Sequence, residues 1–229
     1  MTGRVVLVTG GTKGIGHAVV ERFTADGDRA IPVGHDDCDV TDETAVTALF
    51  DRVGTVDVLV NNAGVSTSAP LRDTTLDDWR RQLDVNATGA FLCTRAALPG
   101  MLERGSGRIV TVASIAGVAG SRYTAGYTAS KHAAVGLMRV VAAEVAGTGV
   151  TANAVCPTFV RTEMTGRTLR RIAAATGRTE AESEAALVAG LPLGRLLEPD
   201  EVAFAVAFLA APEAAAINGQ VLVLDGGGR

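Results

Sequence analysis

The chain has 229 residues, of which 47% are hydrophobic, and its 21 basic and 25 acidic side chains give a formal net charge of −4. The hydrophobic fraction excludes an intrinsically disordered chain, and the charge offers no electrostatic footprint for nucleic acid or an anionic membrane. At about 100–200 residues per domain, the length fits one large domain or two small ones. Only two of the basic residues are lysines, Lys13 and Lys131, which marks both for attention.

The cysteines and the apolar runs limit the kind of protein further. Cys38, Cys93 and Cys156 are odd in number, widely spaced and in no C-x-x-C, which argues against a disulfide framework or a structural zinc site. The first apolar strand begins by Val5 and leaves no room for a signal peptide, and the longest apolar run, 202–211, is too short to span a bilayer. We therefore expect buried cysteines, no metal, no membrane partner and a cytoplasmic location.

Short β-branched runs alternate with longer helical stretches along the chain. The expected strands are Val5–Val8, Ala30–Val33, Val56–Val60, Ile109–Val112, Val150–Val155 and Val221–Leu224. The expected helices are His17–Ala25, Asp42–Val53, Leu76–Arg104, Ala125–Ala146 and Pro199–Ala210. Thr41 and Thr75 are the expected N-caps of two of them. Continuously apolar strands are typical of a sheet covered on both faces, so this alternation predicts a doubly wound parallel sheet in one α/β domain spanning 1–229. The stretch 158–194 is predicted to form a helical flap.

A glycine-rich turn follows the first expected strand and leads directly into a helix. It reads T-G-G-T-K-G-I-G over residues 9–16. Glycines allow a tight turn and a close approach of the backbone to a pyrophosphate, and the helix N-terminus supplies free N–H groups. No Gly-Lys-Ser/Thr triplet occurs, so the turn is not a Walker A loop, and its G-x-x-x-G-x-G spacing differs from G-x-G-x-x-G.

Three further positions carry unusual polar residues. The third expected strand ends in Asn61-Asn62-Ala63-Gly64, and Asn86 lies inside an expected helix, where asparagine is a poor choice. A solvated surface asparagine remains an alternative to a functional Asn86. Ser114 follows the fourth strand, and Tyr127 and Lys131 share one helix face at i and i+4. An ammonium beside a phenol is expected to lower the tyrosine pKa from about 10, which would make Tyr127 a usable acid or base near neutrality.

Together these motifs resemble the short-chain dehydrogenase/reductase family over essentially the whole chain. Pro157 after the fifth strand and the closing Leu224-Asp225-Gly226-Gly227 also fit. The resemblance implies a Rossmann fold with strand order 3-2-1-4-5-6-7 and an NAD(P) cofactor. It also implies that Tyr127 donates a proton to a carbonyl oxygen while hydride leaves the nicotinamide, and that Ser114 hydrogen-bonds the same oxygen. Lys131 would hold the ribose and lower the pKa of Tyr127, and Asn86 would anchor a water of a proton relay.

The sequence departs from the family pattern after the second strand. Asp39-Val40-Thr41-Asp42 follows within six residues of Val33 and resembles the family's D-V-T-D segment, in which Asp39 and Val40 would contact adenine. No room remains for the usual helix and third strand, so we expect both to be shortened or absent and the adenosine end of the site to be more open.

The choice between NADPH and NADH depends on the same region. The acid that NAD enzymes place on the ribose hydroxyls matches Gly34, which is followed by His35. Without that acid, and with Lys13 nearby, NADPH is the expected cofactor and NADH the alternative, although Asp36 or Asp37 could return to the 2′-hydroxyl. By resemblance the cofactor-binding residues are Gly10, Thr12, Lys13, Gly14, Ile15, Gly16, His35, Asp39, Val40, Asn62, Ala63, Gly64, Tyr127, Lys131, Pro157, Val160 and Thr162. Cys156-Pro157-Thr158 stands where the family commonly has Pro-Gly, which we interpret as tolerated variation.

The expected reaction is reduction of a ketone to a secondary alcohol. The chain is similar to aromatic-polyketide ketoreductases, 3-oxoacyl reductases and 3-hydroxybutyrate dehydrogenases, so a β-ketoacyl group is one candidate substrate. The alternatives are NAD-dependent oxidation of a small hydroxy compound and a non-catalytic dinucleotide-binding protein. Arg161 and Arg122 could meet an anionic substrate group or be solvated surface residues. Family members usually assemble through the helices that carry Asn86 and Tyr127, so a homodimer or homotetramer is expected.

Overall fold

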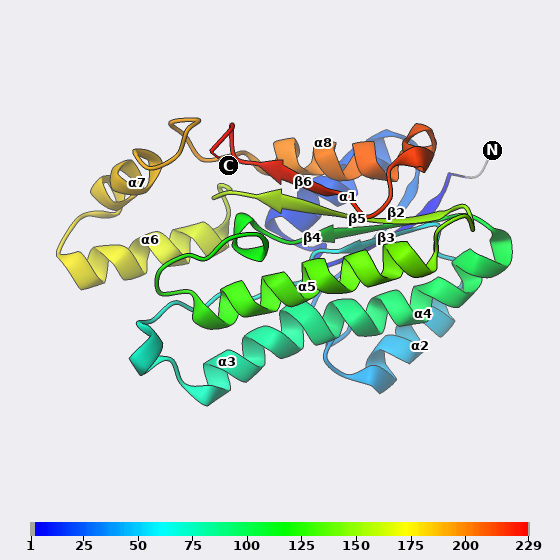
Figure 1. Cartoon of the computed structure of the whole chain (residues 1–229), viewed down its shortest axis with the longest axis horizontal. Coiled ribbons are helices and arrows are strands. Elements are labelled where there is room, and N and C mark those ends of the chain that lie inside the picture. The colour runs from blue at the N-terminus through cyan, green and yellow to red at the C-terminus, as the bar shows by residue number, and fades with distance from the viewer. Residues whose placement is uncertain (1–2, 229) are drawn as a thin grey trace.

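The computed structural model describes residues 3–228 and forms one six-stranded parallel sheet flanked by helices (Figure 1). The strands are β1 Val5–Thr9, β2 Arg29–Val33, β3 Val58–Asn61, β4 Gly107–Val112, β5 Val150–Pro157 and β6 Val221–Leu224. The helices are α1 Gly14–Ala25, α2 Glu43–Val53, α3 Leu76–Leu83, α4 Gly89–Arg104, α5 Ala125–Glu144, α6 Glu163–Thr176, α7 Glu180–Val188 and α8 Pro199–Ala210. The predicted doubly wound α/β class is confirmed.

The sheet separates two hydrophobic cores because successive strand side chains point to opposite faces. Leu7 of β1 packs in the core under α2, α4 and α5, whereas its neighbours Val6 and Val8 pack in the core under α1 and α8. Figure 1 shows these two helical layers on opposite sides of the strands. α6 and α7 lie beyond the layers, at the end of the molecule toward which the arrowheads of β4, β5 and β6 point. In sheets of this kind ligands bind at that carboxyl edge.

The strand order is β2-β1-β3-β4-β5-β6, which is the family order without its outermost strand. Between the end of β2 at Val33 and the start of α2 at Glu43 the chain forms only turns, in which the N–H groups of Asp37 and Cys38 donate to the Gly34 carbonyl. The expected loss of strand three and its preceding helix is confirmed. β2 is consequently the edge strand on this side of the sheet.

The helix boundaries bring one correction and one confirmation. Thr41 is not the N-cap of α2; that position belongs to Asp42, whose Oδ1 accepts from the N–H groups of Thr44 and Ala45 at 2.8 and 3.2 Å. The Thr41 side chain is instead turned back to Asp39, to which its hydroxyl donates. Thr75 does cap α3, accepting from a backbone N–H at 3.1 Å.

The expected helix over 76–104 is interrupted where the sequence places Asn86. α3 and α4 are joined by a π-helical turn over Asp84–Thr88, with the N–H of Gly89 donating to the carbonyl of Asp84. π-Helical turns of this kind are frequent at functional sites. The predicted local disruption is therefore present, and it turns Asn86 into the interior of the protein, where it is 3% exposed.

No helix within residues 3–228 is long and apolar enough to cross a membrane. Over the same range, no group of three or more His, Cys, Asp or Glu side chains could hold a metal ion.

Candidate active site

The glycine turn is held open by backbone geometry that only glycine tolerates. Gly10 and Gly14 have φ angles of +64° and +56°, in the left-handed region that other residues avoid. A Cβ on Gly16 would lie 2.1 Å from the carbonyl oxygen of Gly10, so no side chain fits there. The amide of Asn62 fixes the turn by donating to the carbonyls of Thr9 and Gly10 at 2.9 and 3.1 Å.

The same turn leaves donors for a ligand. α1 begins at Gly14, and the residue before it, Lys13, makes no side-chain cap. The first N–H groups of the helix therefore remain available as hydrogen-bond donors, and they lie at the positive end of the helix dipole. A turn with glycines at positions 10, 14 and 16, in front of a helix without a side-chain cap, fits the pyrophosphate of a dinucleotide, which is the fit that the sequence predicts.

The side-chain amide of Asn86 links the loop after β3 to α5. Its Oδ1 accepts from the N–H of Val65 at 2.8 Å, and its Nδ2 donates to the Val65 carbonyl and to Ser130 Oγ, both at 2.9 Å. Both amide hydrogens are thereby used. A Cβ on Gly64 would lie 3.2 Å from Asn86 Oδ1 and 3.5 Å from Lys131 Nζ, so Gly64 keeps the space between them free. The water-anchoring role of Asn86 stays a prediction, and it cannot use this amide group as donor.

Ser114, Tyr127 and Lys131 meet at the end of β4. Ser114 follows the strand, is 9% exposed, and its Oγ accepts from the N–H of Ala116 at 3.1 Å. Lys131 is 5% exposed, and its Nζ donates to the carbonyl of Val112 at 2.9 Å and lies 5.8 Å from the centre of the Tyr127 ring. The structure therefore brings the three side chains together as the motif spacing predicts.

The electrostatics of the trio differ from the expectation. Burial raises the pKa of Tyr127, and a hydrogen bond with the Ser114 side chain opposes this only in part. Burial also lowers the pKa of Lys131 from 10.5 to about 8. Lys131 Nζ donates to the Val112 carbonyl, and the pKa of Tyr127 shifts upward because of burial; the role of Lys131 in lowering that pKa stays a prediction. A protonated phenol is nevertheless the form that a general acid requires.

The segment after β5 lies near the glycine turn. Pro157 ends the strand, Val160 forms an isolated bridge with Leu197, and Thr162 caps α6. A Cβ on Gly14 would lie 3.3 Å from the Thr162 methyl, so this segment touches the glycine turn. Thr162, one of the positions predicted for the nicotinamide side, thus lies close to the start of α1.

At the expected adenosine end, residues of the D-V-T-D segment form hydrogen bonds with one another. Asp39 Oδ1 accepts from the N–H and the hydroxyl of Thr41 at 2.9 and 2.8 Å, and these hydrogen bonds lower the pKa of Asp39. Val40 packs against α4, since a Cβ on Gly89 would lie 2.7 Å from its Cγ2. His35 is exposed. Lys13, expected to face a 2′-phosphate, has its ammonium 3.7 Å from the carboxylate of Glu163.

Comparison with known proteins identifies the group of proteins that share this arrangement. A family model described as "Enoyl-(Acyl carrier protein) reductase" matches residues 3–228. The chain belongs to the short-chain dehydrogenase/reductase family. The sequence is 35% identical to the 3-oxoacyl-[acyl-carrier-protein] reductase FabG of Vibrio cholerae, with 99% of this chain and 98% of that protein covered. It is 39% identical to a putative ketoacyl reductase of the monensin polyketide synthase from Streptomyces virginiae, covering 99% and 97%.

A solved structure agrees with these relatives. Actinorhodin polyketide ketoreductase, as a variant with NADPH, superposes with a TM-score of 0.88 at 35% identity, and 98% of this chain and 97% of that chain are covered. The Rossmann fold predicted from the motifs is therefore confirmed.

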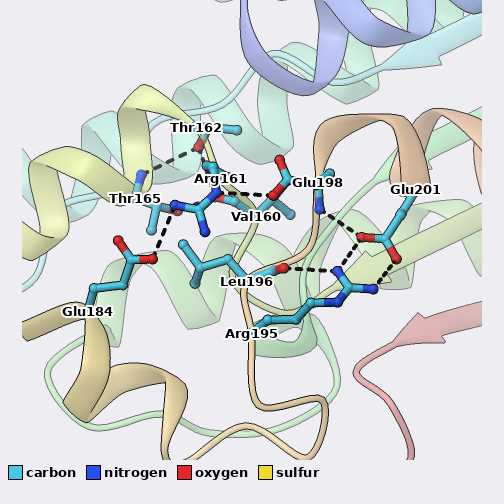
Figure 2. A network of polar contacts seen from close by, with 9 residues as sticks. All are labelled: Val160, Arg161, Thr162, Thr165, Glu184, Arg195, Leu196, Glu198 and Glu201. Atoms are coloured by element: carbon cyan, nitrogen blue, oxygen red, sulfur yellow. Dashed lines mark hydrogen bonds and ion pairs between the residues drawn. The ribbon is translucent and has the colours of Figure 1, made fainter. Parts of the chain in front are cut away.

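In this short-chain dehydrogenase/reductase, Arg161 joins the segment after β5 to α7 and to the start of α8. Arg161 donates from Nε to Glu198 and from a terminal nitrogen to Glu184 of α7, both at 3.1 Å (Figure 2). These carboxylates raise the pKa of Arg161. The suggestion that Arg161 could meet an anionic substrate group is not supported, because its guanidinium is already paired twice. Arg122 lies exposed, with its guanidinium 5.4 Å from the centre of the Tyr123 ring.

The structure shows two further contacts that the sequence did not predict. Arg195 holds Glu201 with two hydrogen bonds of 2.7 and 2.8 Å and so fixes the start of α8, as Figure 2 also shows. Arg171 donates to Ser68 Oγ at 2.8 Å and links α6 to the loop after β3. The pair Arg171 and Ser68 lies 103 positions apart, so no local pattern could have found it. The three cysteines, by contrast, are free and buried as expected.

Proposed function

We propose that this protein reduces a ketone to a secondary alcohol with NADPH and that its substrate is a β-ketoacyl compound. The observation that carries the proposal is the convergence of Ser114, Tyr127 and Lys131 at the carboxyl edge of the sheet, beside a glycine cradle suited to a dinucleotide. The 3-oxoacyl and ketoacyl reductases among the relatives support the substrate class.

Each residue of the site has a separate role in the proposed reaction. A bound reduced nicotinamide cofactor supplies the hydride. Tyr127 holds the proton at its hydroxyl and delivers it to the substrate oxygen, and Ser114 orients that oxygen. Burial keeps the phenol protonated before the reaction, because it raises the pKa of Tyr127. Lys131 and Asn86 are buried beside this site, where we expect Lys131 to hold the ribose and Asn86 to anchor a relay water without donating from its side-chain amide.

The cradle residues would hold the cofactor. The glycines at 10, 14 and 16 and the first N–H groups of α1 suit the pyrophosphate. The end of β2 carries Gly34 in place of an acid, and the related actinorhodin ketoreductase structure contains NADPH. Both support NADPH over NADH. Asn62, Ala63, Gly64, Pro157, Val160 and Thr162 complete the proposed set on the ribose and nicotinamide side.

We further infer the organisation of the whole molecule. The chain acts as a single domain over 1–229, and residues 158–194, with α6 and α7, form the flap over the substrate. Exposed apolar side chains on α4 and α5, among them Phe91, Leu102 and Val140, support assembly into a homodimer or homotetramer. A cytoplasmic location is the remaining part of the proposal.

A panel of ketones, including β-ketoacyl thioesters, tests the proposal when NADPH consumption is followed by absorbance. Tyr127→Phe is expected to lower kcat by about 10²–10⁴-fold while the Kd for NADPH stays unchanged. Tyr123→Phe is the matched control, because Tyr123 is the only other tyrosine and is 55% exposed. Full activity in Tyr127→Phe, or NADPH binding by the wild type without turnover of any ketone, would overturn the proposed reaction.

A further inference from the structure

A buried glutamine of α3 lies beside the first turn of α5, which carries Tyr127. Gln82 is 1% exposed, so its amide has to find its hydrogen-bond partners inside the protein. Its Oε1 accepts from the backbone N–H of Thr67 at 3.0 Å, and its Nε2 donates to the Asp78 carbonyl at 3.1 Å. Only one orientation of the amide presents an acceptor to the first group and a donor to the second. The side chain is therefore fixed, with one of its partners in the loop after β3.

α5 has a glycine at the position that faces this amide. A Cβ on Gly126 would lie 2.6 Å from Gln82 Nε2. Gly126 lies inside the helix and does not have a positive φ angle, so its backbone conformation does not require glycine. Glycine also destabilises a helix relative to other residues. The missing side chain is explained by space, because it lets the Gln82 amide approach the backbone of α5 directly before Tyr127.

Asn86, four positions after Gln82, makes a comparable contact on the other side of Tyr127. Its amide binds the N–H and the carbonyl of Val65 and donates to Ser130 Oγ. Ser130 Oγ in turn donates to the carbonyl of Tyr127 at 2.8 Å. The two buried amides therefore hold alternate residues of the loop after β3, and they contact α5 just before and just after Tyr127 in the sequence.

We infer that Gln82 is a positioning residue, which sets the spacing between the loop after β3 and the first turn of α5 so that Tyr127 reaches the substrate oxygen. The inference rests on the proposed function, because it requires that Tyr127 delivers the proton. Gln82 acts through the backbone of Gly126, the residue before Tyr127. Proton transfer requires hydrogen-bond distance between the two heavy atoms, so a displacement of about 1 Å slows it. The glycine cradle belongs to other elements, β1 and α1, and NADPH binding should not depend on Gln82.

Hydrogen exchange of single backbone amides, followed by NMR, tests the contact without any substrate. Gln82→Met keeps an unbranched side chain of similar length but offers no acceptor to the Thr67 N–H. Gly126→Ala leaves Gln82 in the chain but places a methyl group where its amide lies. In both variants the Thr67 N–H should exchange about tenfold faster than in the wild type. The Val65 N–H, which Asn86 holds, should keep its protection and is the internal control.

The kinetic test uses acetoacetyl-CoA as a β-ketoacyl thioester and NADPH as the reductant. Each single variant should lower kcat and kcat/KM together by about tenfold, the pattern of a loss confined to the transition state, while the Kd for NADPH stays unchanged. Because both substitutions break the same contact, the double variant should also lose about tenfold, whereas independent effects would multiply to roughly a hundredfold.

Two matched controls should keep the kcat of the wild type. Arg81→Met makes the same replacement at the exposed position of α3 directly before Gln82. Gly136→Ala adds the same methyl group to α5 at a glycine where a Cβ would meet nothing within 4 Å. Gln82→Ala, which leaves room for the methyl group of Gly126→Ala, takes the place of Gln82→Met if the methionine lowers the Tm.

The outcomes separate this inference from the proposed function. If the Thr67 N–H exchanges equally fast in the wild type and in both variants, Gln82 does not hold the loop and the inference is wrong. Faster exchange of Thr67 with an unchanged kcat would also overturn it, because Gln82 would then only stabilise the fold. A hundredfold loss in the double variant would show that the two substitutions act independently, which contradicts the shared contact. If the wild type itself reduces no ketone with NADPH, the proposed function fails and this inference falls with it.

Discussion

The buried Lys131 ammonium gives a prediction whose size follows from the structure. Lys131 is 5% exposed, and burial lowers its pKa from 10.5 to about 8. The unfolded chain therefore binds this proton more tightly than the folded protein does. Between pH 8 and 10.5 the unfolded state binds one more proton than the folded state. The free energy of unfolding therefore increases as the pH rises through this range, and the folded protein becomes more stable.

The pKa values set the magnitude. The difference between 10.5 and about 8 corresponds to roughly 3 kcal/mol when the full pH window is crossed. Between pH 7 and pH 9.5 the gain is about 2 kcal/mol, because the upper part of the window lies beyond pH 9.5. Lys131→Met retains an unbranched side chain of similar length but has no proton to titrate. This variant should therefore lack the gain.

Urea unfolding at pH 7 and at pH 9.5 measures the difference directly. The change in unfolding free energy between the two pH values should be about 2 kcal/mol more favourable for the wild type than for Lys131→Met. The other titratable groups are common to both proteins, so their contributions largely cancel in this difference. Lys13→Met is the control, because the Lys13 side chain is 74% exposed and should leave the wild-type slope intact. Parallel pH dependence in the wild type and Lys131→Met would refute the argument.

Two further substitutions test the cradle and the flap. Gly16→Ala places a methyl group 2.1 Å from a carbonyl oxygen of the glycine turn and should abolish NADPH binding in calorimetry. Gly136→Ala on α5 is the control, because a Cβ there meets nothing within 4 Å. This variant should still bind NADPH, and its free energy of unfolding in urea should rise by about 1 kcal/mol. Loss of NADPH binding in both variants would contradict the steric argument. Glu184→Gln breaks one of the two ion pairs of Arg161, so trypsin should cut the flap faster while global stability changes by less than about 1 kcal/mol. Glu180→Gln on the same helix is the control and should not alter the rate of trypsin cleavage. If both substitutions accelerate cleavage equally, the ion pair between Arg161 and Glu184 does not hold this segment in place.

The layered fold and the missing strand could be predicted from the sequence because both depend on local pattern. Continuous apolar runs alternating with helical spacing specify strands covered on both faces. The short interval between Val33 and Asp39 cannot hold a helix and a strand, and the structure forms only turns there. The end of a helix is less well determined, since Thr41 and Asp42 are both good caps and only the folded turn selects Asp42.

The motifs likewise placed Ser114, Tyr127 and Lys131 correctly, because residues at strand ends and on one helix face have positions fixed by the period of the element. The period does not fix what a long side chain touches. Lys131 turns to the carbonyl of Val112, and the pKa of Tyr127 is raised by a burial that no spacing reveals. For the same reason the sequence could predict that Asn86 interrupts its helix, but it could not predict the hydrogen bond between Asn86 and Val65.

Sequence alone thus determined the family, the order of the elements and which side chains lie at the edge of the sheet. The tertiary structure decided which charges meet there. Arg161 pairs with residues 23 and 37 positions away, and Asp37 returns to Gly34 because the shortened turn leaves its backbone N–H groups no strand to pair with. Such contacts depend on partners brought together by folding and on the loss of water around them, and neither is encoded in local spacing.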